Sequence, residues 1–279
     1  MSERGGRRPT TTALSEPSEV GTVTRLRAEG LALGYDGRIV VPNLDVTVLD
    51  RKMTAIVGAN ACGKSTLLRG LARLLPPKDG AVYLDGRSLA DLSTLDVAKV
   101  LGLLPQTPVA PDGITVADLV ARGRYPHQGW FRRWTARDHD AVARALDATG
   151  TADLVDRPIR ELSGGQRQRV WVAMALAQDT DLLLLDEPTT FLDINHQVEL
   201  LRLLRTLNAE SGKTIVAVLH DLNLACRFCD HIIAMSDGAI VAEGPPTEIV
   251  TAALVEKVFG MACLVVPDPV AGTPMVVPA

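Results

Sequence analysis

The sequence has no apolar run long enough to cross a membrane. Its longest uninterrupted apolar run covers only residues 170–177, whereas a membrane-spanning helix needs about 20 residues. Positive charge is not in excess either, because 29 Lys and Arg residues stand against 33 Asp and Glu residues, for a net charge of -4. We therefore do not expect the whole surface to bind polyanions, although this balance does not exclude a local basic patch.

Cysteine is scarce. Four residues occur at irregular spacing, Cys62, Cys226, Cys229 and Cys263, which does not predict a disulfide framework. The N-terminal segment has no apolar stretch typical of a signal peptide, so we expect a reducing, cytoplasmic setting. Cys226 and Cys229 have CxxC spacing without a second pair, which favours packed or idle thiols over a redox or metal site.

The composition is that of a folded protein. Hydrophobic residues make up 47% of the 279 positions and charged residues 22%, unlike a disordered chain. Residues 1–24 are polar and lack periodicity, which predicts a flexible N-terminal tail. Residues 25–258 are predicted to form one domain, and the proline-rich residues 259–279 an extended C-terminal arm.

Strand and helix signals alternate through the domain. Turn signals divide residues 26–48 into short apolar stretches, as in an antiparallel β segment. Further strands are predicted at 53–57, 80–85, 100–104, 182–185, 215–219 and 232–235, and helices at 67–75, 114–120, 138–149 and 194–207. This alternation indicates an α/β fold with a mainly parallel sheet covered by helices. The stretch from about 90 to 165 is mostly helical and is predicted to be an insertion.

A phosphate-binding loop lies between the predicted strand 53–57 and the helix that follows. The pattern GxxxxGK[ST] is matched by Gly58, Ala59, Asn60, Ala61, Cys62, Gly63, Lys64, Ser65 and Thr66. In such a loop backbone N–H groups surround phosphate oxygens, Lys64 reaches the β- and γ-phosphates and Ser65 ligates Mg²⁺. The alternative, an ordinary glycine turn, is disfavoured by the strand–loop–helix context.

Two carboxylates follow the apolar strand 182–185. Asp186 can hold Mg²⁺ through water, and Glu187 can orient and polarise an attacking water. Acidic residues are common at strand ends, so Asp186 and Glu187 indicate a catalytic site only in combination with the phosphate loop.

A second anion-binding edge is predicted at residues 162–166. Ser163, Gly164, Gly165 and Gln166 precede a helix expected to start near Arg167, and the N-terminus of a helix attracts anions. No strand precedes this segment to place it beside the phosphate loop.

Together the phosphate loop, LSGGQ at 162–166 and LLLLDEP at 182–188 resemble the nucleotide-binding subunit of an ATP-binding cassette (ABC) transporter, over about residues 26–258. The resemblance implies a P-loop NTPase cassette with a mainly parallel sheet core, an antiparallel β subdomain and a helical insertion. It also implies ATP hydrolysis with Mg²⁺ as cofactor.

Four further positions are similar to family positions. Tyr35 resembles the aromatic residue that stacks on adenine, and Gln106 the Q-loop residue that contacts Mg²⁺ and water and links to the membrane partner. Asp193 resembles the residue that communicates across the dimer, and His220 the switch histidine that touches the γ-phosphate. Without the resemblance, Tyr35 would be read as a strand residue and His220 as a structural or surface residue.

The partners are also implied by the resemblance. Two such subunits form a head-to-tail homodimer in which each ATP lies between one phosphate loop and residues 163–166 of the other subunit. Hydrolysis then drives an integral membrane permease, which an extracytoplasmic substrate-binding protein serves. The chain would be a peripheral protein on the cytoplasmic face of the membrane, and no nucleic-acid partner is expected.

Details within the family point to uptake. Residues 122–127 (RGRYPH), 162–178, 189–194 and the proline-rich ending resemble ATPases of iron-siderophore, haem and vitamin B12 importers, with ferric siderophores expected first. Ala61 and Cys62 depart from the family, where many members carry a glycine and a serine or alanine. Neither position supplies a catalytic side chain.

Several alternatives stay open. The aromatic and arginine residues of 122–137 fit a local helical core with solvated arginines, a surface facing the permease, or a single-stranded nucleic-acid site. A soluble ABC ATPase acting on DNA or ribosomes is a rival function, although only 98 positions separate Lys64 from Leu162 and they lack sustained heptads. A non-hydrolysing regulator is disfavoured by Glu187 and His220.

Overall fold

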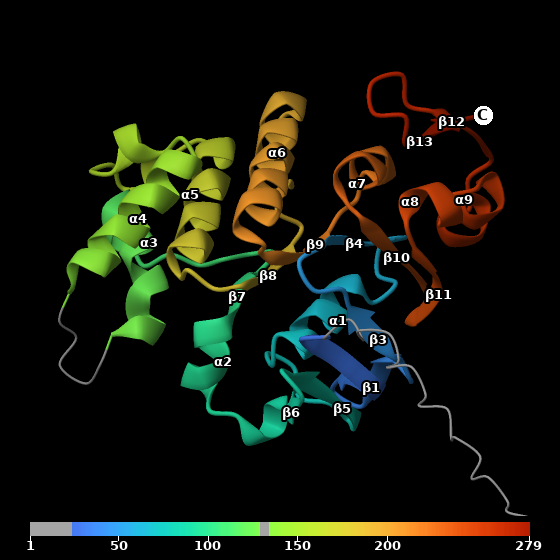
Figure 1. The fold of residues 1–279 in the computed structure, drawn as a ribbon, viewed down its shortest axis with the longest axis horizontal. Helices are drawn as coiled ribbons and strands as arrows, with labels where there is room; N and C mark the ends of the chain where they lie inside the picture. The colour runs from blue at the N-terminus through green and yellow to red at the C-terminus, as the bar shows by residue number, and fades with distance from the viewer. Residues whose placement is uncertain (1–23, 129–133) are drawn as a thin grey trace, which may run out of the picture.

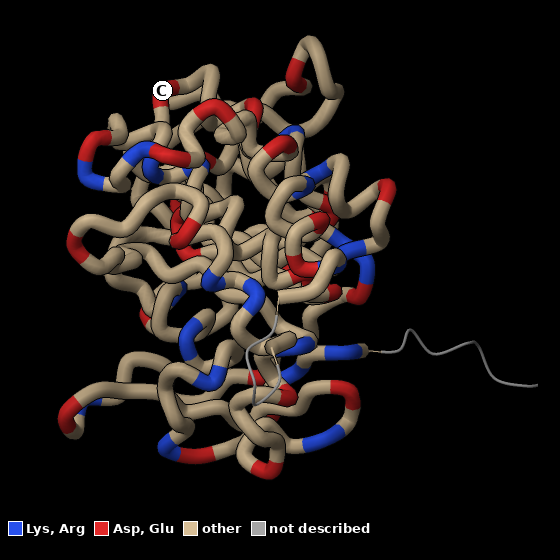
Figure 2. Tube along the Cα trace, turned by 90° about the vertical axis from the view of Figure 1, so that its left-hand side faces the viewer, with Lys and Arg blue, Asp and Glu red and all other residues tan. Residues whose placement is uncertain are grey.

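The computed structural model describes residues 24–128 and 134–279 (Figure 1). The predicted N-terminal tail therefore lies, apart from its last residue, outside the described part. Within these two ranges no helix has the length and apolar character needed to span a membrane. Figure 2 shows basic and acidic residues interspersed along the trace, as the near balance of charges predicts.

A six-stranded sheet forms the centre, in the order β11-β10-β4-β9-β8-β7. Its strands are β4 (Met53–Gly58), β7 (Leu101–Leu104), β8 (Leu182–Asp186), β9 (Thr214–Val218), β10 (His231–Ser236) and β11 (Ala239–Gly244). The pairs from β7 to β10 are parallel, and β11 returns antiparallel beside β10. Strands β4, β8 and β9 are buried along their whole length, as expected for a parallel sheet covered on both faces.

A second, antiparallel sheet is built mainly from the N-terminal part of the chain. It contains β1 (Leu26–Tyr35), β2 (Arg38–Val41), β3 (Val46–Val48), β5 (Asp79–Leu84) and β6 (Arg87–Ser88). Helix α1 (Lys64–Leu71) lies between the two sheets (Figure 1) and packs Leu67 and Leu68 into a core shared with β1 and β4. The phosphate loop thus leads into a helix buried between two layers.

The helices form a separate lobe, at the left of Figure 1. Its elements are α3 (Val116–Ala121), η2 (Arg122–His127), α4 (Ala136–Ala148), η3 (Ala152–Leu154), η4 (Ile159–Glu161) and α5 (Gly164–Ala177), while η1 (Leu89–Asp91) and α2 (Thr94–Val100) precede it and α6 (Ile194–Ser211) follows. The stretch 90–165 is not helical throughout, because β7 pairs with β8 in the central sheet.

The C-terminal segment folds back on the domain. After α7 (Leu222–Phe228), α8 (Pro246–Ile249) and α9 (Ala252–Phe259), the expected extended arm forms a hairpin of β12 (Cys263–Pro267) and β13 (Pro274–Pro278). The side chain of Asn223 on α7 accepts a hydrogen bond from the N–H of Val276 at 2.7 Å and donates to its carbonyl at 3.1 Å. The Asn223 amide thus pairs with both backbone groups of Val276, as a neighbouring strand would, and holds the hairpin against α7.

The two thiols with CxxC spacing are buried around the end of α7. Burial raises the pKa of Cys226 to about 12 and raises that of Cys229 as well. A thiol with such a pKa holds its proton near neutral pH and is a poor nucleophile and metal ligand. Their environment fits packed thiols.

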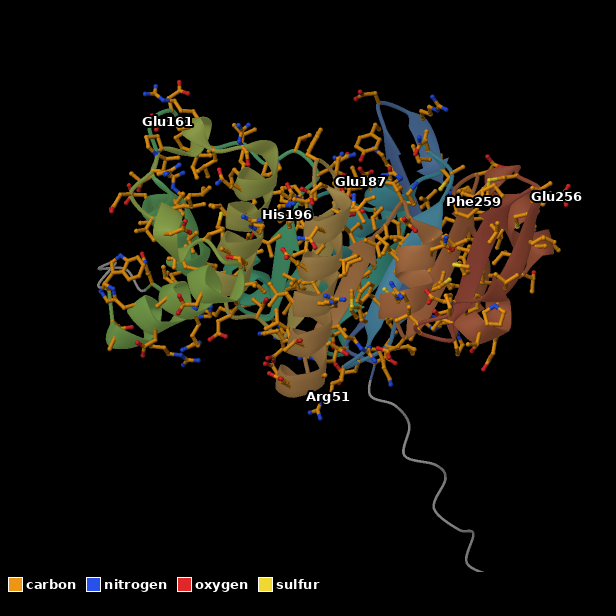
Figure 3. The ribbon with its side chains drawn as sticks, turned by 90° about the horizontal axis from the view of Figure 1, so that it is seen from above. Arg51, Glu161, Glu187, His196, Glu256 and Phe259 are labelled. Carbon is orange, nitrogen blue, oxygen red and sulfur yellow. The ribbon has the colours of Figure 1, made fainter. Side chains whose placement is uncertain are left out.

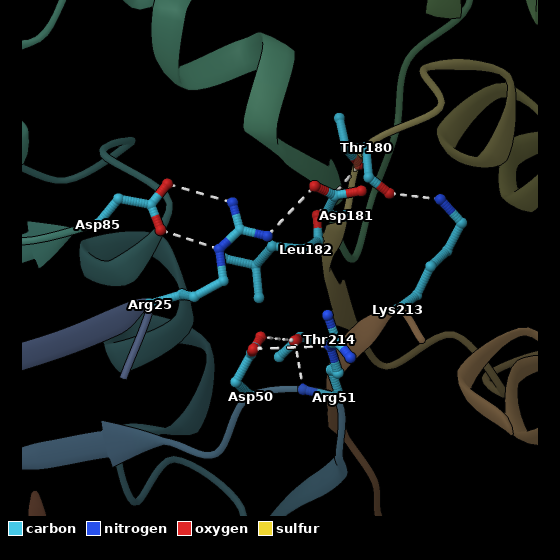
Figure 4. Close-up of polar contacts among 9 residues, drawn as sticks. All are labelled: Arg25, Asp50, Arg51, Asp85, Thr180, Asp181, Leu182, Lys213 and Thr214. Carbon is cyan, nitrogen blue, oxygen red and sulfur yellow. Dashed lines mark hydrogen bonds and ion pairs between the residues drawn. The ribbon is translucent and has the colours of Figure 1, made fainter. Parts of the chain in front are cut away.

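Polar contacts join the two sheets at the amino-terminal edge of the central sheet (Figure 4). The Arg25 guanidinium donates to Asp85 at 2.8 and 3.1 Å and to Asp181, just before β8, at 3.2 Å. Beside it, Thr214 Oγ1 donates to Asp50 Oδ1 at 2.8 Å. Arg25 and Asp85 flank strands β1 and β5 of the antiparallel sheet, whereas Asp181 precedes β8 of the central sheet, so the Arg25 contacts hold one sheet against the other.

We predict that Arg25→Ala lowers the free energy of unfolding by about 1 kcal/mol, because the Asp85 and Asp181 side chains are 46% and 75% exposed and solvent screens such pairs. Urea unfolding at low and high salt measures the loss. The loss in free energy of unfolding should be smaller at high salt, while the affinity for nucleotide stays unchanged. A loss that is insensitive to salt would contradict the ion-pair account.

Candidate functional site

A cavity of about 970 Å³ opens at the carboxyl edge of the central sheet. Many of the residues singled out from the sequence line it, namely Tyr35, Asn60, Ala61, Gly63, Lys64, Ser65, Thr66, Gln106, Glu187 and His220. They come from five separate stretches of the chain. The parallel order of the central strands brings four of these stretches to one edge, and Tyr35 comes from the end of β1 in the antiparallel sheet.

The phosphate loop begins at a position that only glycine tolerates. Gly58 has φ 155°, and a Cβ there would lie 2.3 Å from the carbonyl oxygen of Met235 and 2.8 Å from Cys62 Sγ. The loop then leads to Lys64, whose side chain is buried and whose Nζ donates to the carbonyls of Gly58 at 3.0 Å and Ala59 at 2.8 Å. The ammonium group is thus held across the mouth of the loop, where it can exchange these carbonyls for phosphate oxygens.

Two of the residues expected to hold Mg²⁺, Ser65 and Asp186, lie in contact with each other. Ser65 Oγ donates to Asp186 Oδ1 at 2.7 Å. Asp186 ends β8 with only 1% of its surface exposed, and its Oδ2 has no hydrogen-bond partner among the described residues. Burial raises the pKa of Asp186. A buried, partly unpaired carboxylate beside a hydroxyl is an oxygen donor set that suits Mg²⁺, so these residues fit the cofactor.

Glu187 is the centre of a hydrogen-bonded cluster. It follows Asp186 in the left-handed region, at φ 53°. Its Oε1 lies 2.8 Å from Nε2 of His220, which follows β9, and it also accepts hydrogen bonds from Gln106 and from Thr190, the latter at 3.2 Å. Burial alone would raise the pKa of Glu187, but the hydrogen bonds from His220 and Gln106 outweigh it and hold the pKa below its usual value. A charged carboxylate therefore faces the cavity at neutral pH.

The second anion-binding edge lies elsewhere. Ser163, Gly164, Gly165 and Gln166 do not line the cavity, and Figure 3 shows Glu161, two residues before Ser163, on the helical lobe well apart from Glu187. The neighbours of this segment are instead Phe191 and Leu192, which lie 3.5–3.8 Å from the Cβ positions of the two glycines. One chain thus keeps its two predicted phosphate-binding edges separate.

The helix at that edge starts earlier than predicted. We expected it near Arg167, but α5 begins at Gly164. Ser163 Oγ accepts the N–H of Gln166 at 3.2 Å, and Gln166 Oε1 accepts the N–H of Ser163 at 3.1 Å. This reciprocal capping satisfies two N–H groups and offsets the low helix propensity of the glycines.

Asp193 caps a helix in the structure. Its Oδ1 accepts the N–H of His196 at 2.9 Å and the Nδ1–H at 2.8 Å, at the start of α6. Capping of α6 is thus a structural role for Asp193 that needs no second chain. Communication across a dimer stays a prediction for Asp193.

Five cavity-lining residues were not singled out from the sequence. They come from β2 and from the turn between β10 and β11, namely Arg38, Ile39, Val40, Asp237 and Gly238. The N–H of Gly238 donates to the Cys62 carbonyl at 2.9 Å, so this turn supports the phosphate loop. Asp-Gly between apolar stretches does signal a hairpin turn, but nothing local marks it as part of a site.

Arg124 corrects one expectation for the stretch 122–137. It is not solvated but 1% exposed, and its Nε donates to Asp138 at 2.9 Å. The other aromatic and basic residues of this stretch include Trp130, Phe131, Arg132 and Arg133, which lie outside the described residues.

We predict that Asp186→Asn stabilises the nucleotide-free chain. A carboxyl group whose pKa is raised by folding contributes stability at a pH below its unfolded-state pKa. That contribution is lost as the pH rises through the folded-state pKa. At pH 7 the wild-type chain therefore carries the free-energy cost of a buried charge. The variant should melt about 2–4 °C higher at pH 7, the shift that about 1 kcal/mol produces in a domain of this size. The gain should vanish as the pH falls towards 4.

The same variant should lose the extra thermal stability that Mg²⁺ adds in the presence of ATP, because the amide removes the anionic ligand. Differential scanning calorimetry with and without Mg²⁺ measures both effects. A variant that melts lower at pH 7 and still responds to Mg²⁺ would contradict this site.

Comparisons with known proteins agree with the geometry. The family profile described as ABC transporter matches residues 41–190. The ferric enterobactin transport ATP-binding protein of Escherichia coli is 55% identical over 257 residues, which cover 92% of this chain and 95% of that protein. The iron(3+)-hydroxamate import ATP-binding protein of Bacillus subtilis is 48% identical over 90% of this chain and 93% of its own length.

A solved structure gives the corresponding likeness in three dimensions. It is an ATP-binding cassette in a dimeric, post-hydrolysis state with bound ADP and Pi, 27% identical to this chain, with a TM-score of 0.71 over 79% of this chain and 98% of that one. The predicted fold class, a cassette with a mainly parallel core, an antiparallel β subdomain and a helical insertion, is confirmed. This chain belongs to the ABC transporter family.

Proposed function

We propose that the chain is the ATP-hydrolysing subunit of an ABC importer that takes up ferric siderophores. The observation that carries the hydrolytic part is the contact of Glu187 with His220 at 2.8 Å, beside the phosphate loop in one cavity. A carboxylate held charged at this place can accept a proton from the attacking water, which a nucleotide-binding regulator would not need.

The residues divide the work of hydrolysis. Backbone N–H groups of the phosphate loop and Lys64 would hold the β- and γ-phosphates, and Tyr35, which also lines the cavity, would stack on adenine. Ser65, Asp186 and Gln106 would hold Mg²⁺, which neutralises charge on the phosphates when bound. Glu187 orients the attacking water and takes its proton, while His220 holds the Glu187 carboxylate and contacts the γ-phosphate.

The second edge supports a dimer. Because Ser163, Gly164, Gly165 and Gln166 lie away from the cavity, they are free to close the nucleotide site of a second copy, with Asp193 near the contact. The chain would then act as a homodimer on the cytoplasmic face of the membrane and drive an integral membrane permease that an extracytoplasmic binding protein loads.

The cargo follows from the relatives. Two proteins that align over nearly their whole length carry names for ferric enterobactin and iron(3+)-hydroxamate transport. Both names specify a ferric chelate, which favours this class over haem or vitamin B12.

We predict that Glu187→Gln retains ATP affinity but slows turnover by about 10²- to 10⁴-fold, the usual contribution of a general base. The amide keeps the size of the side chain but cannot take the proton. Phosphate release under saturating ATP measures the rate, and sedimentation shows whether an ATP-bound dimer accumulates.

The matched control is Glu256→Gln. Glu256 is an exposed carboxylate on α9, far from Glu187 (Figure 3), so this variant should hydrolyse ATP at the normal rate. Unchanged turnover in Glu187→Gln would refute the proposed role.

The transport role is tested in cells. In a strain that lacks this chain and any redundant ATPase, uptake of a radiolabelled ferric siderophore should be lost. The wild-type chain should restore it, whereas Glu187→Gln should not. Uptake that persists without the chain would refute the siderophore assignment and leave the ATPase assignment intact.

A further inference from the structure

The C-terminal end of α5 is held by a cluster of hydrogen bonds from three side chains, those of Arg124, His127 and Gln178, which we call the joint. The last carbonyls of a helix normally lack a partner within the helix. Here Arg124 Nη1 donates to the carbonyls of Ala177 at 2.8 Å and Gln178 at 3.4 Å, and His127 Nε2 donates to the Gln178 carbonyl at 2.6 Å. Both donors belong to the stretch 122–127, to which the catalytic mechanism assigns no role.

This joint is rigid on the side of the helical lobe. The Arg124 side chain is 2% exposed and pairs with Asp138, whose other oxygen accepts a hydrogen bond from Thr135 Oγ1 at 2.7 Å at the start of α4. Element η2 also lies directly against α5, because a Cβ on Gly123 would stand 2.3 Å from the Met174 carbonyl. The end of α5 is therefore fixed to both η2 and α4.

The side chain of Gln178 continues the joint towards the catalytic edge. Its Nε2 donates to the carbonyls of Ala98 at 2.6 Å and Leu101 at 3.1 Å, where α2 ends and β7 begins. Strand β7 pairs in parallel with β8. Two residues beyond β7 stands Gln106, which hydrogen-bonds to Glu187. The joint thus connects α5 to the strand that leads directly to Gln106.

We infer that Gln178 is a positioning residue that sets the direction of α5 relative to the central sheet. This inference rests on the proposed function, in which Ser163, at the opposite end of α5, meets the ATP of a second copy. Helix α5 has 14 residues and so is roughly 21 Å long, and a rotation of about 10° at the joint would displace its far end by roughly 4 Å. Hydrogen bonds to phosphate tolerate only a few tenths of an ångström, so the joint decides whether residues 163–166, the signature segment, meet the nucleotide.

The test separates positioning from stability. Gln178→Leu removes both donated hydrogen bonds while it keeps a side chain of similar size. The matched control is Asn208→Leu, because Asn208 Nδ2 likewise donates to a backbone carbonyl beyond the end of a helix, that of Lys213 at 2.8 Å. Asn208 lies on α6 and its bond joins that helix to the chain that follows it, so the change leaves the hydrogen bonds of Gln178 in place. His127→Ala opens the joint from its other side and serves if Gln178→Leu does not fold.

Each change is placed in the Glu187→Gln chain, and three quantities are measured: the melting temperature, the affinity of the monomer for a fluorescent ATP analogue, and the ATP-dependent dimer fraction by sedimentation. We expect Gln178→Leu and Asn208→Leu to lower the melting temperature similarly and to bind the analogue as the parent does. Gln178→Leu and His127→Ala should weaken ATP-dependent dimerisation by at least about fivefold, the lower end of usual coupling between sites, and Asn208→Leu should not.

Equal dimerisation in Gln178→Leu and Asn208→Leu would overturn the inference and leave the proposed function standing. If the parent Glu187→Gln chain itself binds ATP but does not dimerise, the proposed dimeric function fails, and the inference fails with it.

Discussion

The parallel pairing of β10, β4, β9, β8 and β7 is the constraint on which the site depends. Because these strands run in one direction, their carboxyl ends meet at a single edge, and the chain that leaves each strand enters the same cavity. In this way Asn60, Gln106, Glu187 and His220 come together although 160 positions separate the first from the last. The backbone hydrogen bonds of the sheet thus set the distances that the chemistry needs.

The same architecture keeps the second anion-binding edge out of the cavity. Helix α5 starts at Gly164 on the helical lobe, and its other end is fastened through Gln178 to β7. The chain therefore holds its phosphate loop and its second predicted phosphate-binding edge in separate places. Two copies facing head to tail would satisfy both, and the rigidity of α5 and of its joint would then transmit any movement of the helical lobe to the nucleotide.

Much of this was readable from the sequence, for identifiable reasons. The strand before Gly58 is wholly apolar and its loop has a fixed spacing, so the sequence predicted both the loop and its placement. The sequence predicted the start of α5 too late in the chain, because the glycines at 164 and 165 disfavour a helix. The reciprocal hydrogen bonds between Ser163 and Gln166 outweigh this effect. The support that Gly238 gives to Cys62 could not be found, because it joins segments that lie far apart in the sequence. Burial of Arg124 was missed for the same reason, since its partners Ala177 and Gln178 come from another helix.

The central claim is that each nucleotide site is shared by two chains. A mixing experiment tests it most directly: one chain carries Lys64→Ala, and the other carries Ser163→Arg. Each variant alone should be almost inactive, since every site in it lacks either the phosphate loop or the signature segment. Mixed dimers contain one site with both parts intact, so the mixture should hydrolyse ATP faster than either variant alone. A mixture as inactive as its components would contradict the shared site.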